Sequence, residues 1–292
     1  MPTLHRLPTL AVLIVAGGFI AFALPAHAAE SYDNCTGFID SLPATIGSQG
    51  TWCLRKDLST GMSSGQAILV ATNNVTLDCN DFKIGGLSAG VATEAVGIRA
   101  QARQNISVRN CSVRGFNYGV SLAGDNHSVV DSRFDLNTLV GIYMSGDGNE
   151  ARSNVVSATG GQPLTGFALG IVLAGPVARV LDNRVHGVSA MPDAGGLNRL
   201  AGGIQADGGS GAIVGNVVTG IDSTGTAHGI RVYQGIVRDN VVVQTTDNEG
   251  STAIVCLDDG SGSTTGLSDD NSIRSYANAH LNCAVSSAAV EP

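Results

Sequence analysis

The stretch that decides the fold is VGIYMSGDGNEARSNVV, residues 140–156. It holds two phased signals: a Gly-Ile pair ending at Ile142 and, twelve positions later, Asn154 in the frame apolar-x-x-Asn-x-apolar. Both signals recur along the chain, which identifies an internal repeat. The apolar residues at the first position, which we call the anchors, are Ile68, Ile98, Val120, Ile142, Ile171, Ile204, Ile230 and Ile254. The residues at the Asn position, which we call the Asn ladder, are Asn80, Cys111, Ser132, Asn154, Asn183, Asn216, Asn240 and Asn271.

Strand geometry gives this repeat a physical meaning. Side chains alternate across a strand, so the apolar residues flanking each ladder position both point inward when a tight turn lies between them. Asparagine tolerates the left-handed backbone conformation that such a turn needs. One unit is too short to bury its own apolar face, so coils must stack at about 4.8 Å, with ladder amides bonding from coil to coil. The repeat predicts an all-β, single-domain parallel β-helix of about eight three-strand coils.

Two segments resemble a known group. Residues 73–86, NNVTLDCNDFKIGG, and residues 105–116, NISVRNCSVRGF, resemble coils of exported bacterial β-helix-repeat proteins. With the ladder and the Gly-Ile pairs, they resemble the right-handed parallel β-helix, pectin lyase-like superfamily over residues 67–275. The resemblance implies a right-handed solenoid. It does not imply one activity, because that superfamily contains lyases, hydrolases, epimerases and adhesins.

The first 28 residues have the pattern of a signal peptide. An apolar run from Leu10 to Leu24 is followed by Pro25 and then by the small-x-small sequence of residues 26–28. We expect cleavage there and a secreted or periplasmic protein. The alternative is that this segment stays attached as a single membrane anchor. After it, no stretch of the sequence is long and apolar enough to span a bilayer.

The amino-acid composition excludes several classes of protein. Charged residues make up 14% of the 292 positions, glycine occurs 39 times, and the net charge is −8. Low charge argues against disorder, many glycines argue against a helical bundle, and an acidic chain argues against nucleic-acid binding. We expect residues 29–66 and 276–292 to cap the two ends of the solenoid, because an open end would expose unpaired strand edges.

Six cysteines in an exported chain suggest disulfides, although six residues allow 15 pairings. The expected pairs are Cys35–Cys53 and Cys256–Cys283, each closing a local loop, with Cys79–Cys111 as a further candidate.

The residue after each anchor is expected to point outward, in a column that borders the corner with the longest insertions. Insertions on one face of a repeat protein often mark its binding face. The column is Arg99, Ser121, Tyr143, Val172, Gln205, Arg231 and Val255. The predicted binding face is Arg99, Tyr143, Gln205, Asp207 and Arg231, and the catalytic candidates are Arg231, Tyr143 and His228.

Two interpretations of this face are open. Arginine suits carboxylate recognition, so the face is a candidate site for an acidic sugar chain. In a lyase, Arg or Tyr would abstract a sugar proton beside a carboxylate stabilised by a cation. In the alternative interpretation, these are ordinary solvated side chains on a sheet face.

Metal and hydrolase motifs are weak. Asp258 and Asp259 are candidates for a calcium site, but a solvated loop is the favoured interpretation, and no other cofactor is expected. Polygalacturonase-type hydrolases carry Gly-His-Gly and Arg-Ile-Lys. Here His186 and His228 stand in Val-His-Gly and Ala-His-Gly, and Arg-Ile-Lys is absent.

The sequence therefore leaves two functions. The first is an exported protein that binds a carbohydrate or a cell-envelope glycan without catalysis. The second is a polysaccharide-modifying enzyme, a lyase on an acidic polysaccharide.

Overall fold

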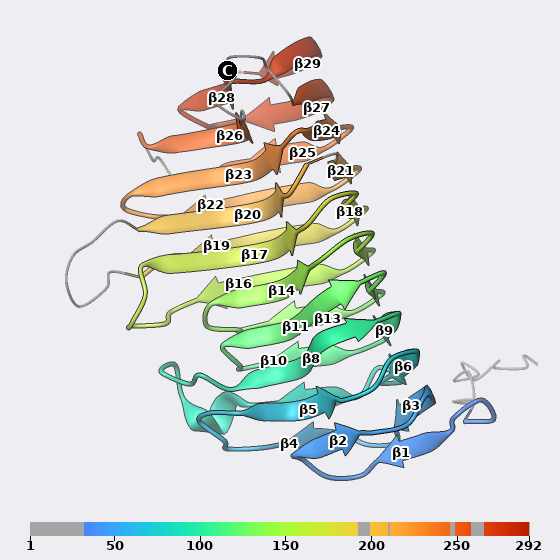
Figure 1. The fold of residues 1–292 in the computed structure, drawn as a ribbon. Coiled ribbons are helices and arrows are strands. Elements are labelled where there is room, and N and C mark those ends of the chain that lie inside the picture. The colour runs from blue at the N-terminus through green and yellow to red at the C-terminus, as the bar shows by residue number, and fades with distance from the viewer. Residues whose placement is uncertain (1–31, 192–198, 210, 246–248, 258–265, 292) are drawn as a thin grey trace, which may run out of the picture. The chain divides into compact units, whose positions relative to one another are not determined.

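The computed structural model describes residues 32–191, 199–209, 211–245, 249–257 and 266–291. The side chains of residues 287–291 are outside that description. The described chain winds into stacked coils whose strands pair in parallel with those of the next coil (Figure 1). The prediction of an all-β parallel β-helix is confirmed.

One wall of the solenoid is a ten-stranded sheet, to which each coil contributes one strand. Its strands are β2 (Ala44–Ile46), β5 (Gln66–Val70), β8 (Val96–Gln104), β11 (Tyr118–Asp125), β14 (Val140–Ser145), β17 (Phe167–Ala174), β20 (Leu200–Asp207), β23 (Thr226–Tyr233), β26 (Ser251–Leu257) and β28 (Asn278–Leu281).

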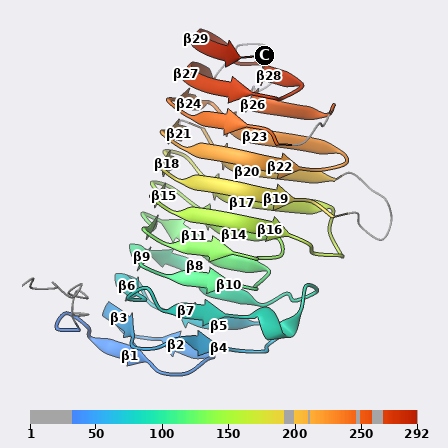
Figure 2. The ribbon, with the colours of Figure 1, turned by 180° about the vertical axis from the view of Figure 1, so that it is seen from behind.

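The other walls form a nineteen-stranded sheet made of two rows that meet at the ladder corner (Figure 2). The first row is β1 (Gly37–Ile39), β3 (Gly50–Leu54), β6 (Val75–Asp78), β9 (Ile106–Arg109), β12 (Ser128–Val130), β15 (Glu150–Arg152), β18 (Arg179–Leu181), β21 (Gly211–Val214) and β24 (Gly235–Arg238). The second row is β4 (Leu58–Ser59), β7 (Lys83–Gly85), β10 (Ser112–Arg114), β13 (Arg133–Asp135), β16 (Val155–Gly160), β19 (Arg184–Ser189), β22 (Val217–Asp222) and β25 (Val241–Val243). Two long strands join both rows, β27 (Leu267–Arg274) and β29 (Ala284–Glu291). A 3-10 helix, η1, covers Leu87–Ala89.

Coil stacking reaches into both segments that were expected to be caps. Strand β2, within residues 29–66, pairs with β5, and β28, within residues 276–292, pairs with β26. Ten strands therefore stand in this sheet where the repeat predicted about eight coils. The terminal coils were missed because they lack the Gly-Ile and Asn signals.

The core is the interior of the coils. All eight anchors are in register on the ten-stranded sheet and at most 1% exposed. Each buried side chain of this size contributes roughly 1.5–3 kcal/mol relative to an exposed one.

A column of glycines precedes the anchors for a steric reason. A Cβ built on Gly203 would lie 2.5 Å from the carbonyl oxygen of Gly229 and 2.5 Å from Cγ1 of Val218. The same clash with the next coil recurs at Gly97, Gly119, Gly141, Gly170 and Gly229. The Gly-Ile signal therefore marks a close backbone approach between coils that leaves no room for a Cβ.

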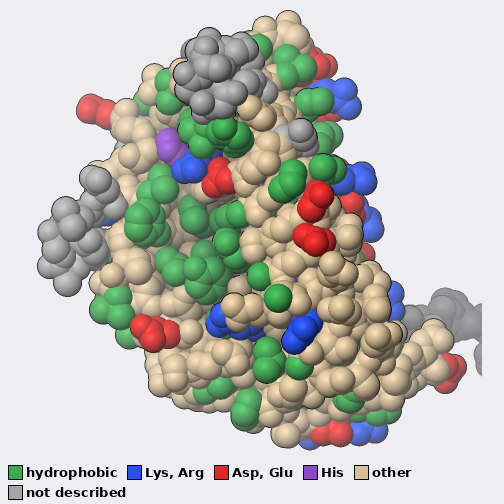
Figure 3. Space-filling view, in the orientation of Figure 1, with side chains coloured by type: hydrophobic (Ala, Val, Ile, Leu, Met, Phe, Trp, Pro, Cys, Tyr) green, Lys and Arg blue, Asp and Glu red, His purple; other side chains and the backbone are tan. Residues whose placement is uncertain are grey.

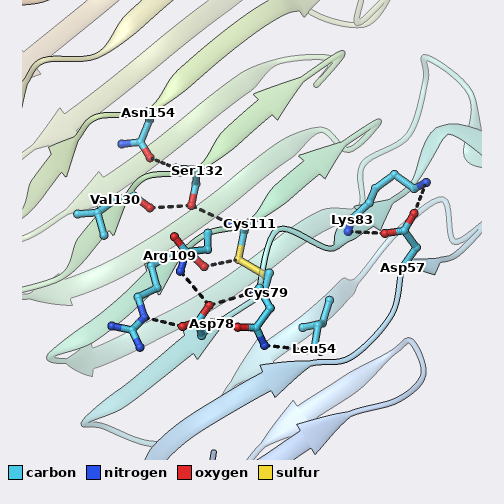
Figure 4. The surroundings of a disulfide bond; sticks show 12 residues. Leu54, Asp57, Asp78, Cys79, Lys83, Arg109, Cys111, Val130, Ser132 and Asn154 are labelled. Carbon is cyan, nitrogen blue, oxygen red and sulfur yellow. Dashed lines mark hydrogen bonds and ion pairs between the residues drawn. A yellow bond between two sulfur atoms is a disulfide. The ribbon is translucent and has the colours of Figure 1, made fainter. Parts of the chain in front are cut away.

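The Asn ladder is a chain of hydrogen bonds at the corner between the two rows. Each Oδ1 accepts the backbone N–H of the preceding ladder residue, from Asn271 through Asn240, Asn216, Asn183 and Asn154 to Ser132, at 2.8–3.1 Å. The Oγ of Ser132 then accepts the N–H of Cys111 at 3.1 Å (Figure 4).

Two expectations about this corner need correction. Except at Asn80, which is itself left-handed, the residue before the ladder position and not the ladder residue has this conformation, as at Asp131, Ser153 and Asp182. Asn80 also differs: its Nδ2 donates to the carbonyl of Leu54 in the coil before, but it is not a member of the chain of bonds between ladder residues described above. The reason is the turn between β6 and β7, which has two more residues than the turn between β9 and β10.

Three disulfides are present. They are Cys35–Cys53, Cys79–Cys111 and Cys256–Cys283, and the second joins two neighbouring coils at the ladder corner (Figure 4).

Candidate functional site

The outward face of the ten-stranded sheet carries three columns of side chains. Strand pairing aligns Arg99, Tyr143, Gln205 and Arg231 in the middle column, one strand spacing apart where their strands are neighbours. The full middle column is Arg99, Ser121, Tyr143, Val172, Gln205, Arg231 and Val255. One flanking column is Val96, Tyr118, Val140, Leu169, Gly202, His228 and Thr252. In the other, Ala123, Ser145, Ala174 and Asp207 align on successive strands, and Tyr233 and Leu257 stand at the same offset on the next two.

A polar cluster forms where β20 and β23 lie side by side. Arg231 Nη2 lies 3.3 Å from Asp207 Oδ2, and both side chains are about one-quarter exposed, at 26% and 28%. Gln205 Nε2 donates to the same carboxylate oxygen. We call these residues, with His228, the Arg231 cluster.

Three buried polar atoms of this cluster have no hydrogen-bond partner among the described residues. They are Asp207 Oδ1, Arg231 Nε and His228 Nδ1. A buried donor or acceptor left unpaired costs about 1–3 kcal/mol, so such atoms gather where a ligand completes the bonding. The cluster offers an acceptor at Asp207 and a donor at Arg231 on one small patch.

His228 is held in its neutral form. Burial lowers the pKa of His228, and the positive charge of Arg231 lowers it further. A neutral imidazole near neutral pH can accept a proton, which is the property of a general base.

Aliphatic side chains lie next to the cluster on β17. Val172 is only 4% exposed although its column faces outward, and Leu169 is half-buried. The Leu169 side chain lies over Gly202, the neighbour of His228 in this column, where a Cβ would be 2.8 Å from Leu169 Cδ2. Figure 3 shows hydrophobic side chains gathered on this face below the place where histidine, basic and acidic side chains meet.

Tyr143 and Arg99 are not part of the Arg231 cluster. Three strand spacings, about 14 Å, separate Tyr143 from Arg231, so the two cannot act on one reacting atom. Tyr143 instead packs edge-to-face against Tyr118, with ring centres 5.9 Å apart. Arg99 donates to Gln101 at 3.2 Å.

Sequence reasoning missed Tyr118 and Leu169. Both stand two positions before an anchor, and so does His228, so the signal was a second fixed offset from the repeat. The glycine of each Gly-Ile pair hid it. A Cβ on Gly203 would meet the core side chains of Val218 and Ile221, so glycine and anchor both face inward and the strict alternation of a strand fails here.

The long connections do gather along one edge. The described parts of the links from the second row to the ten-stranded sheet protrude on the same side of the coils (Figures 1 and 2). The Asp258–Asp259 pair lies outside the described residues. Among the residues that are described, no group of three or more His, Cys, Asp or Glu side chains is arranged to hold a metal ion. No helix in that part of the chain has the length and hydrophobicity to span a membrane.

Known proteins with a similar fold share little sequence with this chain. No curated protein matches the chain. Among solved structures, a Dettilon tailspike protein has 14% identity and a TM-score of 0.49, over 81% of this chain and 53% of the tailspike. The chain thus spans about half the length of that tailspike. The A-module of a mannuronan C-5 epimerase from Azotobacter vinelandii has 15% identity and a TM-score of 0.46, over 88% and 91%. A DFA-IIIase from Arthrobacter chlorophenolicus A6 has 16% identity and a TM-score of 0.41, over 76% and 70%.

The family match is more direct. The family described as "right handed beta helix region" matches residues 59–218, from the end of β4 to β22. This range is more than half of the 292 residues and contains most of the anchors and ladder positions. The protein therefore belongs to the right-handed β-helix family.

Proposed function

We propose that this protein is exported and binds a polysaccharide on the outward face of its ten-stranded sheet, with the Arg231 cluster as the principal contact. The observation that carries the proposal is the set of three unpaired buried polar atoms on Asp207, Arg231 and His228. Export is supported by the signal-peptide pattern and by three disulfides, since disulfides persist in oxidising compartments.

A saccharide fits the mixture of groups in the site. Each sugar hydroxyl both donates and accepts, so it can satisfy the carboxylate oxygen of Asp207 and the Nε of Arg231 together once these one-quarter-exposed side chains turn toward it. The C–H face of a sugar ring is apolar and packs against Leu169 and Val172. A site with aliphatic walls and a few converging polar groups is typical of small-molecule recognition.

A polysaccharide-modifying enzyme is the second candidate, and neutral His228 beside Arg231 favours it. In a lyase, Arg231 would bind a uronate carboxylate while His228 removes the proton α to it. The electrons of that C–H bond form a C=C bond, and the bond to the glycosidic oxygen breaks with the leaving oxygen taking up a proton. Burial and Arg231 both keep His228 ready to accept that proton.

One experiment addresses both candidates. The mature protein is tested for retention on a panel of neutral and acidic polysaccharides by affinity electrophoresis. The same mixtures are monitored in the ultraviolet for unsaturated chain ends, with and without calcium. Retention without new absorbance supports binding alone, and absorbance that grows with time supports a lyase.

The Arg231→Ala variant is expected to lose the effect, and Arg238→Ala is its matched control. Arg238 pairs with Asp239 and lies on β24, in the same coil but in the other sheet. Absence of both retention and turnover across the panel, or equal loss in the two variants, would reject the proposed face.

A further inference from the structure

We infer that the polysaccharide bound by this face is sparsely charged, with acidic sugars separated by neutral ones, and is not a homopolymer of uronates. This inference rests on the proposed function. It concerns the distribution of charge along the face rather than any one side chain.

Two arginines stand in the outward columns of the described residues, one on β8 and one on β23. Within the three outward columns, the lysine and arginine residues among the described positions from β8 to β26 are Arg99 and Arg231. Five strand spacings lie between them, a distance of about 24 Å along the solenoid. A ligand that lies along the columns therefore meets a fixed positive charge only at widely separated points.

The middle of the face has no cationic partner for a carboxylate. Going from Arg99 to Arg231, the middle column presents Ser121, Tyr143, Val172 and Gln205. The flanking positions on β14 and β17 are equally uncharged: Val140, Ser145, Leu169 and Ala174. A carboxylate held against these side chains would lose water without gaining a cation, which is strongly unfavourable.

The same middle section suits neutral sugars. The edge-to-face pair of Tyr118 and Tyr143 and the aliphatic pair of Leu169 and Val172 offer flat apolar area for C–H faces. Asp207, the carboxylate of the cluster, has an unpaired oxygen that accepts from sugar hydroxyls. The net charge of −8 also disfavours a uniformly anionic polymer.

The test uses one polymer backbone at graded charge. Binding of the mature protein is measured for polygalacturonate and for randomly methyl-esterified pectins of increasing ester content, at fixed low salt. The expected affinity is highest at intermediate esterification. Binding of fully de-esterified polygalacturonate is expected to be about tenfold weaker, the effect of roughly one buried unpaired polar group.

A variant that is expected to gain affinity serves as a second test, because a gain in binding cannot result from misfolding. Ser145→Lys places a cation in the middle of the face, and Ser128→Lys adds the same charge on β12 of the other sheet. Ser145→Lys is expected to raise affinity for polygalacturonate several-fold relative to esterified pectin, and Ser128→Lys is expected to leave that ratio unchanged.

The outcomes separate the two proposals. Affinity that rises steadily with charge density, or an unchanged ratio in Ser145→Lys, overturns the inference but leaves polysaccharide binding intact. If no member of the series and no other polysaccharide of the panel binds, the proposed function itself fails.

Discussion

Asn183 and Asn216 are joined by two hydrogen bonds across adjacent coils. The Oδ1 of Asn216 accepts the backbone N–H of Asn183 at 2.8 Å and its Nδ2 at 3.0 Å. The Nδ2 of Asn216 in turn donates to the carbonyls of Val180 and Val214 at 2.9 and 3.1 Å. One amide thus satisfies four polar groups in a place where Asn216 is 0% exposed.

The first prediction concerns this amide. Asn216→Ala should lower the free energy of unfolding by about 2–4 kcal/mol, because buried donors and acceptors on two coils lose their partner. Urea unfolding followed by circular dichroism measures the change. Asn278→Ala, at an exposed position on β28, is the control and should change stability little. Equal changes in the free energy of unfolding for the two substitutions would show that the ladder position contributes no more to stability than an exposed asparagine.

The second prediction concerns the glycine column. Gly203→Ala should destabilise the protein by about 1–3 kcal/mol, because the new methyl group would overlap the carbonyl of Gly229 in the next coil. The midpoint of thermal unfolding reports the loss. Gly47→Ala is the matched control, since its Cβ would meet nothing within 4 Å. A neutral Gly203→Ala would mean that the coils separate easily at this point.

The third prediction concerns pH. His127 is 1% exposed, and its Nδ1 accepts the N–H of Ile106 at 3.2 Å. Burial lowers the pKa of His127, against the opposing effects of a backbone contact with Ala123 and the charge of Asp125. The unfolded chain therefore binds a proton near the ordinary pKa of 6.5 while the folded chain resists it. Stability is full above about pH 6.5 and should fall as the pH drops below it, until the folded pKa is reached.

His127→Asn tests this assignment. Asparagine supplies the same kind of acceptor as Asn149 in the next coil but does not titrate in this range. The variant should lose part of the slope of unfolding free energy against pH between about pH 6.5 and pH 5, measured by urea unfolding. His186→Gln, at an exposed position on β19, should keep the full slope. An unchanged slope in His127→Asn would assign the pH dependence to other groups.

The fourth prediction separates the Arg231 cluster from the middle of the binding face, where Tyr143 stands. Tyr143→Ala should weaken binding of long oligosaccharides about fivefold through loss of an aromatic contact, while short ones that fill only the Arg231 cluster keep their affinity. Calorimetric titration with a size series of pectic oligosaccharides measures this difference. Arg231→Ala should weaken short and long ligands alike. Equal weakening of all lengths by Tyr143→Ala would place the tyrosine in the same site as the cluster.

Much of the fold could be predicted because it depends on spacing along the chain. The twelve-residue offset between Ile142 and Asn154 identifies a coil, and the next copy identifies its neighbour. Asn80 shows where this reasoning fails: a turn longer by two residues moves the side chain out of the ladder while the local pattern stays intact. The strands at the two ends of the solenoid were not predicted, because the repeat pattern is absent from their sequences.

The candidate site, too, has a part that the repeat predicts and a part that depends on contacts between coils. The alignment of Arg99, Tyr143, Gln205 and Arg231 follows from the repeat, since each stands one position after an anchor. The separation of Tyr143 from the Arg231 cluster follows only from counting strands between them. The pairing of Arg231 with Asp207, and the atoms that this pairing leaves without partners, depend on the side-chain geometry of two adjacent coils.

The sequence by itself determined the solenoid, its core columns and the face that carries polar side chains, because each depends on a period within one coil. Only the tertiary structure decided which side chains on that face meet. Contacts between the repeating coils join residues about 21 to 36 positions apart, and their register depends on insertions whose lengths vary from coil to coil. The charge spacing that selects a ligand is therefore a property of the stack of coils and not of any single repeat.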